Sequence, residues 1–189
     1  MRRRYALQHL FRDQEPAFVI DAVPAVLAWA PEGSESRGLR FKLAFADRTG
    51  AAQTDVAFSI HWRRDELELR DASVLSRAER MRKGQSPHRE HLVEVAGYGV
   101  AMCAISALLP GRRVVGWSRY AAPDILFDAT PDALRGVEVA ARSGGGLSKL
   151  RELDAQKRPG LVDDPAVAEA WLSLWIAQPA LGWFFQVKP

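Results

Sequence analysis

The sequence predicts a mixed α/β (α+β) fold, in which an antiparallel β region precedes a core of helices and strands. Three short apolar runs follow one another at residues 112–120, 125–129 and 136–142, with turn residues between them. A run of small and apolar residues at 96–107 precedes them, and its three- and four-residue spacings indicate a helix buried against a sheet. The second half of the chain is therefore expected in the order helix, strand, strand, strand, helix, strand.

Composition excludes several classes of protein. The chain has 189 residues, of which 48% are hydrophobic and 26% charged, as is typical of a globular domain. Its formal net charge of +3 is small for a dedicated nucleic-acid binder, although local basic runs can still act. A single cysteine, Cys103, rules out an internal disulfide and a cysteine-based zinc site. With no apolar window of about 20 residues and no secretory apolar region near Met1, we expect a cytoplasmic protein without a membrane span.

The first half of the chain is rich in β-like runs. Residues 1–16 are compatible with either a first strand or a short helix. Short runs with many aromatic and branched side chains then alternate with turn signals, at 17–30, 38–47, 54–62 and 66–74. In the second of these runs Phe41, Leu43 and Phe45 alternate with polar or small residues, as in a strand with one buried face. These runs predict an antiparallel sheet.

A polar, basic segment at 75–88 is the best candidate for a boundary because it contains Gly84 and Pro87. We therefore divide the chain into an N-terminal β region, 1–85, and an α/β core, 86–189. Whether the β region is separate or extends the sheet of the core stays open.

Within the core, capping and breaking residues set the expected limits of the elements. Ser86 and Pro87 favour a helix start, and Pro110-Gly111 favours its end. A second helix is expected at 147–157, stopped by Pro159-Gly160. Residues 166–178 allow a helix or a strand, of which we favour a buried strand, and 182–189 are expected as the last strand.

Two acidic residues stand out in the three-strand segment. Asp124 begins the second strand, and Glu138 lies inside the third among apolar neighbours, where a carboxylate needs a partner. Two carboxylates on adjacent strands can hold a divalent metal ion. The alternatives are that Asp124 caps a turn and that Glu138 pairs with Arg142 or Arg119 across the sheet.

Pro123-Asp124 before one strand and Glu138-Val139-Ala140 on the next resemble the PD-(D/E)XK nuclease-like superfamily. The resemblance covers about 87–178, including a preceding helix that carries Glu94. It implies a restriction-endonuclease-like αβββαβ core. It also implies Mg²⁺ held by Glu94, Asp124 and Glu138, which activates water for attack on a phosphodiester.

This sequence departs from the family pattern at the catalytic lysine, whose position is taken by Ala140. Arg142 points to the same face of the strand as Glu138, and Lys149 or Lys157 on the following helix offers another cation. The expected catalytic set is Asp124, Glu138, Arg142 and Lys149.

Because of Ala140, we expect a non-catalytic or weakly catalytic protein with this fold. It would act as a binding or assembly subunit of a bacterial multi-protein system of the defence or toxin-immunity type, with a protein partner and nucleic acid as a further ligand. The alternative is a Mg²⁺-dependent nuclease that hydrolyses DNA or RNA. A third hypothesis is a structural domain in which Glu138 makes a buried ion pair.

Overall fold

The computed structural model describes all residues except 32–33, 47–53, 86–90, 119–121 and 128–132. Its helical elements are η1 (Leu7–His9), α1 (Leu10–Asp13), α2 (Pro16–Val19), α3 (Ala22–Trp29), α4 (Ser34–Arg37), α5 (Arg64–Arg70), α6 (Val74–Arg82), α7 (Leu92–Leu108) and α8 (Leu147–Val162). Its strands are β1 (Arg2–Ala6), β2 (Leu39–Ala46), β3 (Thr54–His61), β4 (Gly116–Trp117), β5 (Ile125–Leu126), β6 (Leu134–Gly144), β7 (Val167–Gln178) and β8 (Leu181–Lys188).

One mixed sheet of eight strands runs through the chain, in the order β1-β3-β2-β8-β7-β6-β5-β4. The hairpins β2–β3 and β7–β8 and the series β4–β5–β6 are antiparallel, whereas β1–β3, β2–β8 and β6–β7 are parallel. The pairing of β2 with β8 joins the N-terminal β region to the core, so the region extends the same sheet. The mixed α/β class is confirmed.

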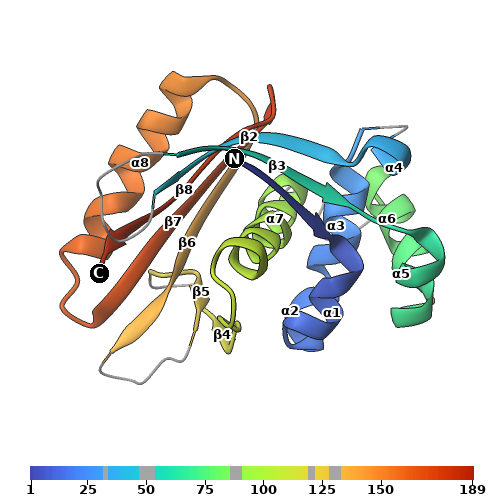
Figure 1. Cartoon of the computed structure of the whole chain (residues 1–189), viewed down its shortest axis with the longest axis horizontal. Coiled ribbons are helices and arrows are strands. Elements are labelled where there is room, and N and C mark those ends of the chain that lie inside the picture. Colours follow the sequence, from blue (N-terminus) through green and yellow to red (C-terminus); the bar gives the residue numbers. More distant parts are fainter. Residues whose placement is uncertain (32–33, 47–53, 86–90, 119–121, 128–132) are drawn as a thin grey trace.

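Helices cover both faces of the sheet (Figure 1). On one face α7 packs against β6 and against α3, and α6 packs on α3. On the other face α8 lies over β7 and β8. Each face has its own apolar core, and the α8 side is built around Leu150, Leu153 and Leu161 with alternate residues of β7. No helix in the described part of the chain is long and apolar enough to cross a membrane.

Close packing fixes α7 between its neighbours. A Cβ atom added at Gly97 would lie 2.6 Å from Ala141 Cβ on β6, and one at Gly99 would lie 2.5 Å from Val26 Cγ2 on α3. Both positions therefore need glycine for the helix to approach its partners. The helix ends at Leu108, before Pro110-Gly111 as predicted, whereas Ser86 and Pro87 lie outside the described residues.

Two runs predicted as β are helical, so that part of the N-terminal prediction is wrong. Residues 17–30 form α2 and α3, and α3 is buried along seven consecutive residues. A helix enclosed on all sides is apolar all round, so its sequence lacks the periodicity that marks a surface helix. Residues 66–74 fall in α5 and the start of α6, where Leu67 is buried but Leu69 is 84% exposed. Their alternating pattern therefore does not mark two faces of a strand.

The remaining secondary-structure predictions are partly confirmed and partly wrong. Residues 1–16 contain both a strand, β1, and short helices, and the proposed boundary segment begins with α6 rather than a loop. The strands at 38–47, 54–62, 166–178 and 182–189 are confirmed as β2, β3, β7 and β8. The predicted stop at Pro159-Gly160 is wrong, because α8 continues to Val162. Leu161 is fully buried in the α8-side core, and this contact holds the last turn although Pro159 lacks a backbone donor.

Candidate functional site

The antiparallel pairing of β5 with β6 brings Asp124 beside Glu138. Ile125 pairs with Val137, so the residue before β5 faces the next residues of β6. The backbone N–H of Val139 donates a hydrogen bond of 2.8 Å to Asp124 Oδ2. Gly136 allows the two strands this close approach, since a Cβ atom there would lie 2.0 Å from the Ile125 carbonyl oxygen. The Asp124 carboxylate thus extends the hydrogen bonding with β6 beyond the two residues of β5.

Glu138 is buried and paired with a lysine from α8. The residue is 4% exposed, and Lys157 Nζ donates to its Oε1 at 2.5 Å. Its second oxygen, Oε2, is buried and has no hydrogen-bond partner among the described residues. A buried carboxylate oxygen without a partner costs free energy, so its presence calls for an explanation. One oxygen of the Glu138 carboxylate therefore lacks a hydrogen-bond partner from the described residues.

Asp124 and Glu138 both interact with the ammonium group of Lys157. Burial, and next the charge of Glu138, raise the pKa of Asp124 to about 6, although the hydrogen bond from Val139 opposes the rise. Burial lowers the pKa of Lys157, but the hydrogen bond and charge of Glu138 outweigh it and raise that pKa overall. With Asp124 ionised, two carboxylates share one ammonium, so the cluster carries an excess negative charge. A simple buried ion pair would carry no net charge.

An aromatic group from α7 and β4 borders the acids. Burial, followed by the charges of Asp124, Glu94 and Glu138, raises the pKa of the Tyr98 hydroxyl above its usual value. The Tyr98 ring stacks on Trp117, with centroids 5.4 Å apart, and Phe18 packs on Trp117 at 5.9 Å. Trp117 is 37% exposed. Tyr98 therefore connects the acidic pair to an aromatic surface at the rim.

The other predicted site residues lie further from the pair. Arg142 donates to the carbonyl of its neighbour Ala141, and Lys149 pairs with Glu152 on the surface of α8. Neither makes a hydrogen bond or ion pair with Asp124 or Glu138 in the described part of the chain. Glu94 is about half-exposed on α7, where His91 Nδ1 lies 3.5 Å from its Oε2. Its charge still acts on Tyr98 and Lys157, which places it at the margin of the cluster.

Two residues of the cluster lie outside the set predicted from the sequence: the sequence offers Lys157 only as an alternative, beside Lys149, to Arg142, and it does not single out Tyr98. Helix geometry explains the choice of Lys157 over Lys149. From Gly144 back to Glu138 the strand covers about 20 Å, and α8 then returns over the sheet at about 1.5 Å per residue. Lys149 has advanced only about 3 Å from the start of α8, whereas Lys157 has advanced about 15 Å and meets Glu138. For Tyr98 the signal was its spacing of four residues from Glu94, which puts both on one side of α7.

The donor set fits a hard divalent cation with few protein ligands. No group of three or more His, Cys, Asp or Glu side chains suited to a metal occurs among the residues that the structure describes. Mg²⁺, however, is usually held by one or two carboxylates, with water and substrate phosphate as the remaining ligands. Asp124 and the unpartnered Oε2 of Glu138 meet that requirement, and the excess negative charge favours a cation.

Comparison of the chain with protein-family models, with curated proteins and with solved structures finds no match.

Proposed function

We propose that this protein is a metal-dependent phosphodiesterase that acts on nucleic acid. The observation that carries the proposal is the contact of Lys157 with Glu138 beside Asp124. The sequence alone favoured a non-catalytic protein because Ala140 occupies the lysine position of the family it resembles. A lysine that reaches Glu138 from α8 removes that objection, since two acids and one ammonium then meet at one point.

The order of the elements supports the proposal. α7, β4, β5, β6, α8 and β7 follow one another as helix, strand, strand, strand, helix, strand, which is the order implied by a restriction-endonuclease-like core. Asp124 directly precedes the second strand of this series and Glu138 lies on the third, which agrees with the resemblance. We assign the chain to that fold as part of the proposal.

Each residue of the cluster has a role in the proposed hydrolysis. Asp124 and Glu138 would hold Mg²⁺, which when bound lowers the pKa of water and stabilises charge on a phosphate. The Lys157 ammonium has three donors, one of which contacts Glu138, so it can also orient a water molecule or a phosphate oxygen. Tyr98 would act as a positioning residue, because the charges of Asp124 and Glu138 act on its half-buried phenol.

A cleavage assay tests the proposal. Plasmid DNA, single-stranded DNA and RNA are incubated with the protein and Mg²⁺ or Mn²⁺. We expect metal-dependent cleavage that falls about a hundredfold or more in Glu138→Gln and in Lys157→Met. Lys149→Met is the matched control, since it removes a lysine from the same helix and should keep full activity. Absence of cleavage under all conditions, with a folded protein, would refute the proposal.

A second function, binding or assembly without catalysis, is favoured by one observation. Ala140 is buried in the α8-side core, and Lys157 already compensates the charge of Glu138 without a metal. Such a protein would use the fold to bind a protein partner. A protein that binds no divalent cation in calorimetry, yet is recovered in a stoichiometric complex, would favour this function over hydrolysis.

A further inference from the structure

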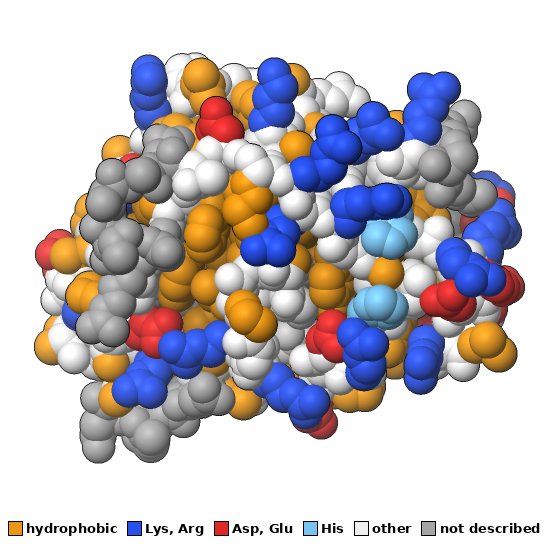
Figure 2. All heavy atoms as spheres, viewed as in Figure 1, with side chains coloured by type: hydrophobic (Ala, Val, Ile, Leu, Met, Phe, Trp, Pro, Cys, Tyr) orange, Lys and Arg blue, Asp and Glu red, His pale blue; other side chains and the backbone are white. Residues whose placement is uncertain are grey.

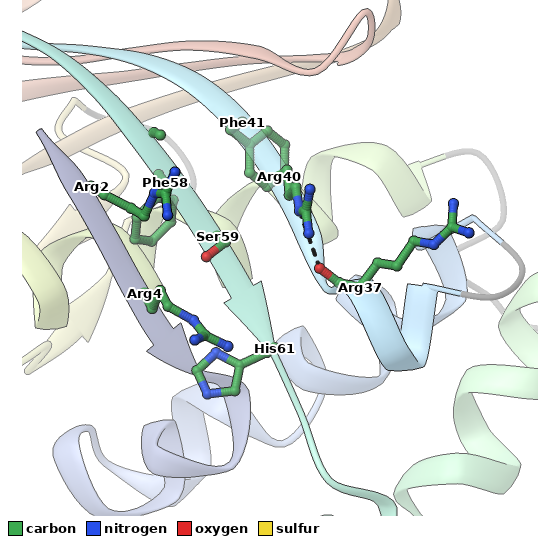
Figure 3. A pocket seen from close by; sticks show the side chains of 9 residues that line it. Arg2, Arg4, Arg37, Arg40, Phe41, Phe58, Ser59 and His61 are labelled. Carbon is green, nitrogen blue, oxygen red and sulfur yellow. Dashed lines mark hydrogen bonds between the residues drawn. The ribbon is translucent and has the colours of Figure 1, made fainter.

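A basic surface lies on the sheet away from the acidic cluster. β1, β3 and β2 carry a hollow with a volume of about 370 Å³, which we call the basic trough. Its polar lining consists of Arg2, Arg4, Arg37, Arg40, Ser59 and His61 (Figure 3). Lysine and arginine side chains gather over this part of the molecule, beside histidine side chains (Figure 2).

Strand register creates the trough. Arg2 pairs with Ala57 and Arg4 with Ser59 on one side, while β2 places Lys42 opposite Ala57 and Arg40 opposite Ser59 on the other. Paired residues point to the same face of a sheet. Cations on the two outer strands therefore flank small residues on the central strand. The two rows are two strand spacings apart, about 10 Å.

Among the residues that the structure describes, the cations of the trough have no acidic partner. No aspartate or glutamate lines it, and Arg2, Arg4 and Arg37 make no ion pair with a described acid. Arg40 donates to the backbone carbonyl of Arg37, at 3.4 Å. Elsewhere arginines have carboxylate partners, as in the pairs Arg77–Asp71, Arg112–Glu169 and Arg158–Asp154. Burial, followed by the charge of Arg4, lowers the pKa of His61, as expected where cations repel one another.

The shape of the trough selects among anionic ligands. The major groove of a double helix alone is about 12 Å wide, so a duplex is wider than the trough and would touch only its rims. A single strand fits between the two rows of cations. Phe41 and Phe58 are 3% and 1% exposed because their rings belong to the opposite face, so neither offers a stacking surface to a base in the trough. Four arginines line the trough, and their charge favours contact with the sugar–phosphate backbone.

We propose that the basic trough binds the phosphate backbone of a single nucleic-acid strand, without regard to its sequence. The inference deepens the proposed function by naming a substrate class, and it rests on that function only for the link to cleavage. β2 lies three strands from β6, about 14 Å across the sheet, and α8 covers the strands between them. The trough is therefore a separate binding surface that would retain a long strand while the acidic cluster acts on it.

The test measures binding in the absence of metal, so that no cleavage occurs. Fluorescence anisotropy is recorded with a labelled single strand of about 16 nucleotides, with the corresponding duplex, and with anionic phospholipid vesicles as competitor. The variant Arg4→Gln/Arg40→Gln is compared with Arg70→Gln/Arg80→Gln, which removes two exposed arginines from α5 and α6.

We expect the trough variant to bind the single strand at least tenfold more weakly. The slope of log K against log salt should also fall by about 1.4, since each phosphate contact of a single strand contributes about 0.7. The control variant should bind like the wild type. Equal losses in both variants, tighter binding of the duplex, or preferential binding of the vesicles would overturn the proposal.

A small activated diester, bis(p-nitrophenyl) phosphate, separates this proposal from the proposed function. Its hydrolysis needs Asp124, Glu138 and Lys157 but no trough. If the trough variant loses strand binding while the wild type hydrolyses no diester, the trough stands and the phosphodiesterase fails. If the wild type hydrolyses the diester and the trough variant binds strands normally, the trough fails and the phosphodiesterase stands.

Discussion

The backbone N–H of Val139 donates a hydrogen bond of 2.8 Å to Asp124 Oδ2, so Asp124 is attached to the residue that directly follows Glu138. The two acids are therefore held together by the main chain of β6 and do not depend on a flexible loop for their approach. The hydrogen bond favours the ionised form of Asp124, whereas the burial of Asp124 and the charge of Glu138 raise the pKa of Asp124 to about 6. The protonation of Asp124 should consequently be visible in the stability of the fold.

We expect the free energy of unfolding to fall as pH rises from about 4 to about 6, relative to the variant Asp124→Asn. The folded-state pKa of about 6 lies above the usual 3.8, so the folded protein binds the proton more tightly than the unfolded chain in this window. The loss is on the order of 3 kcal/mol and is complete above the folded pKa. Urea unfolding of both proteins at pH 4.5 and 7.5 measures it. A difference between the two proteins that is the same at both pH values would contradict the assignment.

Removing the ammonium should destabilise the protein more than removing a surface lysine. Lys157→Met leaves Asp124 and Glu138 without a cation, and we expect a loss of roughly 3 kcal/mol at pH 7.5, at the low end for a buried pair because the Lys157 side chain is 34% exposed. In a Glu138→Gln background the same change should cost clearly less. A double-mutant cycle by denaturant unfolding gives the coupling.

Lys149→Met is the control for that cycle. Its partner Glu152 is 62% exposed, so the loss should stay below about 1 kcal/mol. Equal effects at the two lysines would show that the Glu138 pair is an ordinary surface contact.

Divalent cations should stabilise the wild-type protein against heat. A cation that binds only the folded state contributes about 2.7 kcal/mol at a concentration of 100 times its Kd. Thermal unfolding with increasing Mn²⁺ should therefore shift Tm upward in the wild type and not in Asp124→Asn/Glu138→Gln. The shift should be larger at pH 7.5 than at pH 5, where Asp124 holds a proton. A metal-dependent shift retained by the double variant would place the metal elsewhere.

Gly136 should be required for both stability and activity. A Cβ atom there meets the Ile125 carbonyl oxygen at 2.0 Å and Pro123 Cγ at 2.7 Å, so Gly136→Ala should push β5 away and displace Asp124. We expect destabilisation of about 2 kcal/mol or more together with loss of cleavage. Gly160→Ala is the control, because nothing lies within 4 Å of its added Cβ in α8, and it should gain up to about 1 kcal/mol. Thermal unfolding and the cleavage assay, applied to both variants, decide the matter.

The sequence predicted the core better than the N-terminal half, and the reason is physical. In the core, runs of small residues, turn residues and two acids each mark a separate element, so the order from α7 to β7 was predicted before the structure. Helix α3 gave the wrong signal because all of its sides are covered and its apolar pattern has no period. Helix α5 misled in the opposite way, since its alternating Glu and Leu residues imitate a strand while Leu69 points to solvent.

The two acidic residues of the candidate site could be predicted from the sequence, but the lysine that pairs with Glu138 could not. Asp124 directly precedes β5 and Glu138 lies on the adjacent strand β6, so their approach follows from the register of this one strand pair. Lys157 comes from a helix, and only the length of α8 and its direction over the sheet decide which lysine reaches Glu138. The basic trough was even less accessible, because it combines Arg2 and Arg4 with Arg40 from a distant strand. Its first strand, β1, pairs in parallel with β3, and turn residues in the sequence do not indicate a pairing of this kind.

The insertion of β8 between β7 and β2 has a consequence for how the chain can be divided. If the chain were expressed as two fragments separated between α6 and α7, the C-terminal fragment would expose β8 along its whole edge, and the N-terminal fragment would expose β2 in the same way. Unpaired edges of this kind attract other strands. The two fragments should therefore bind each other through these edges. The trough lies in the N-terminal fragment and the acidic cluster in the C-terminal one, so neither can be moved to another protein without leaving an unpaired strand edge.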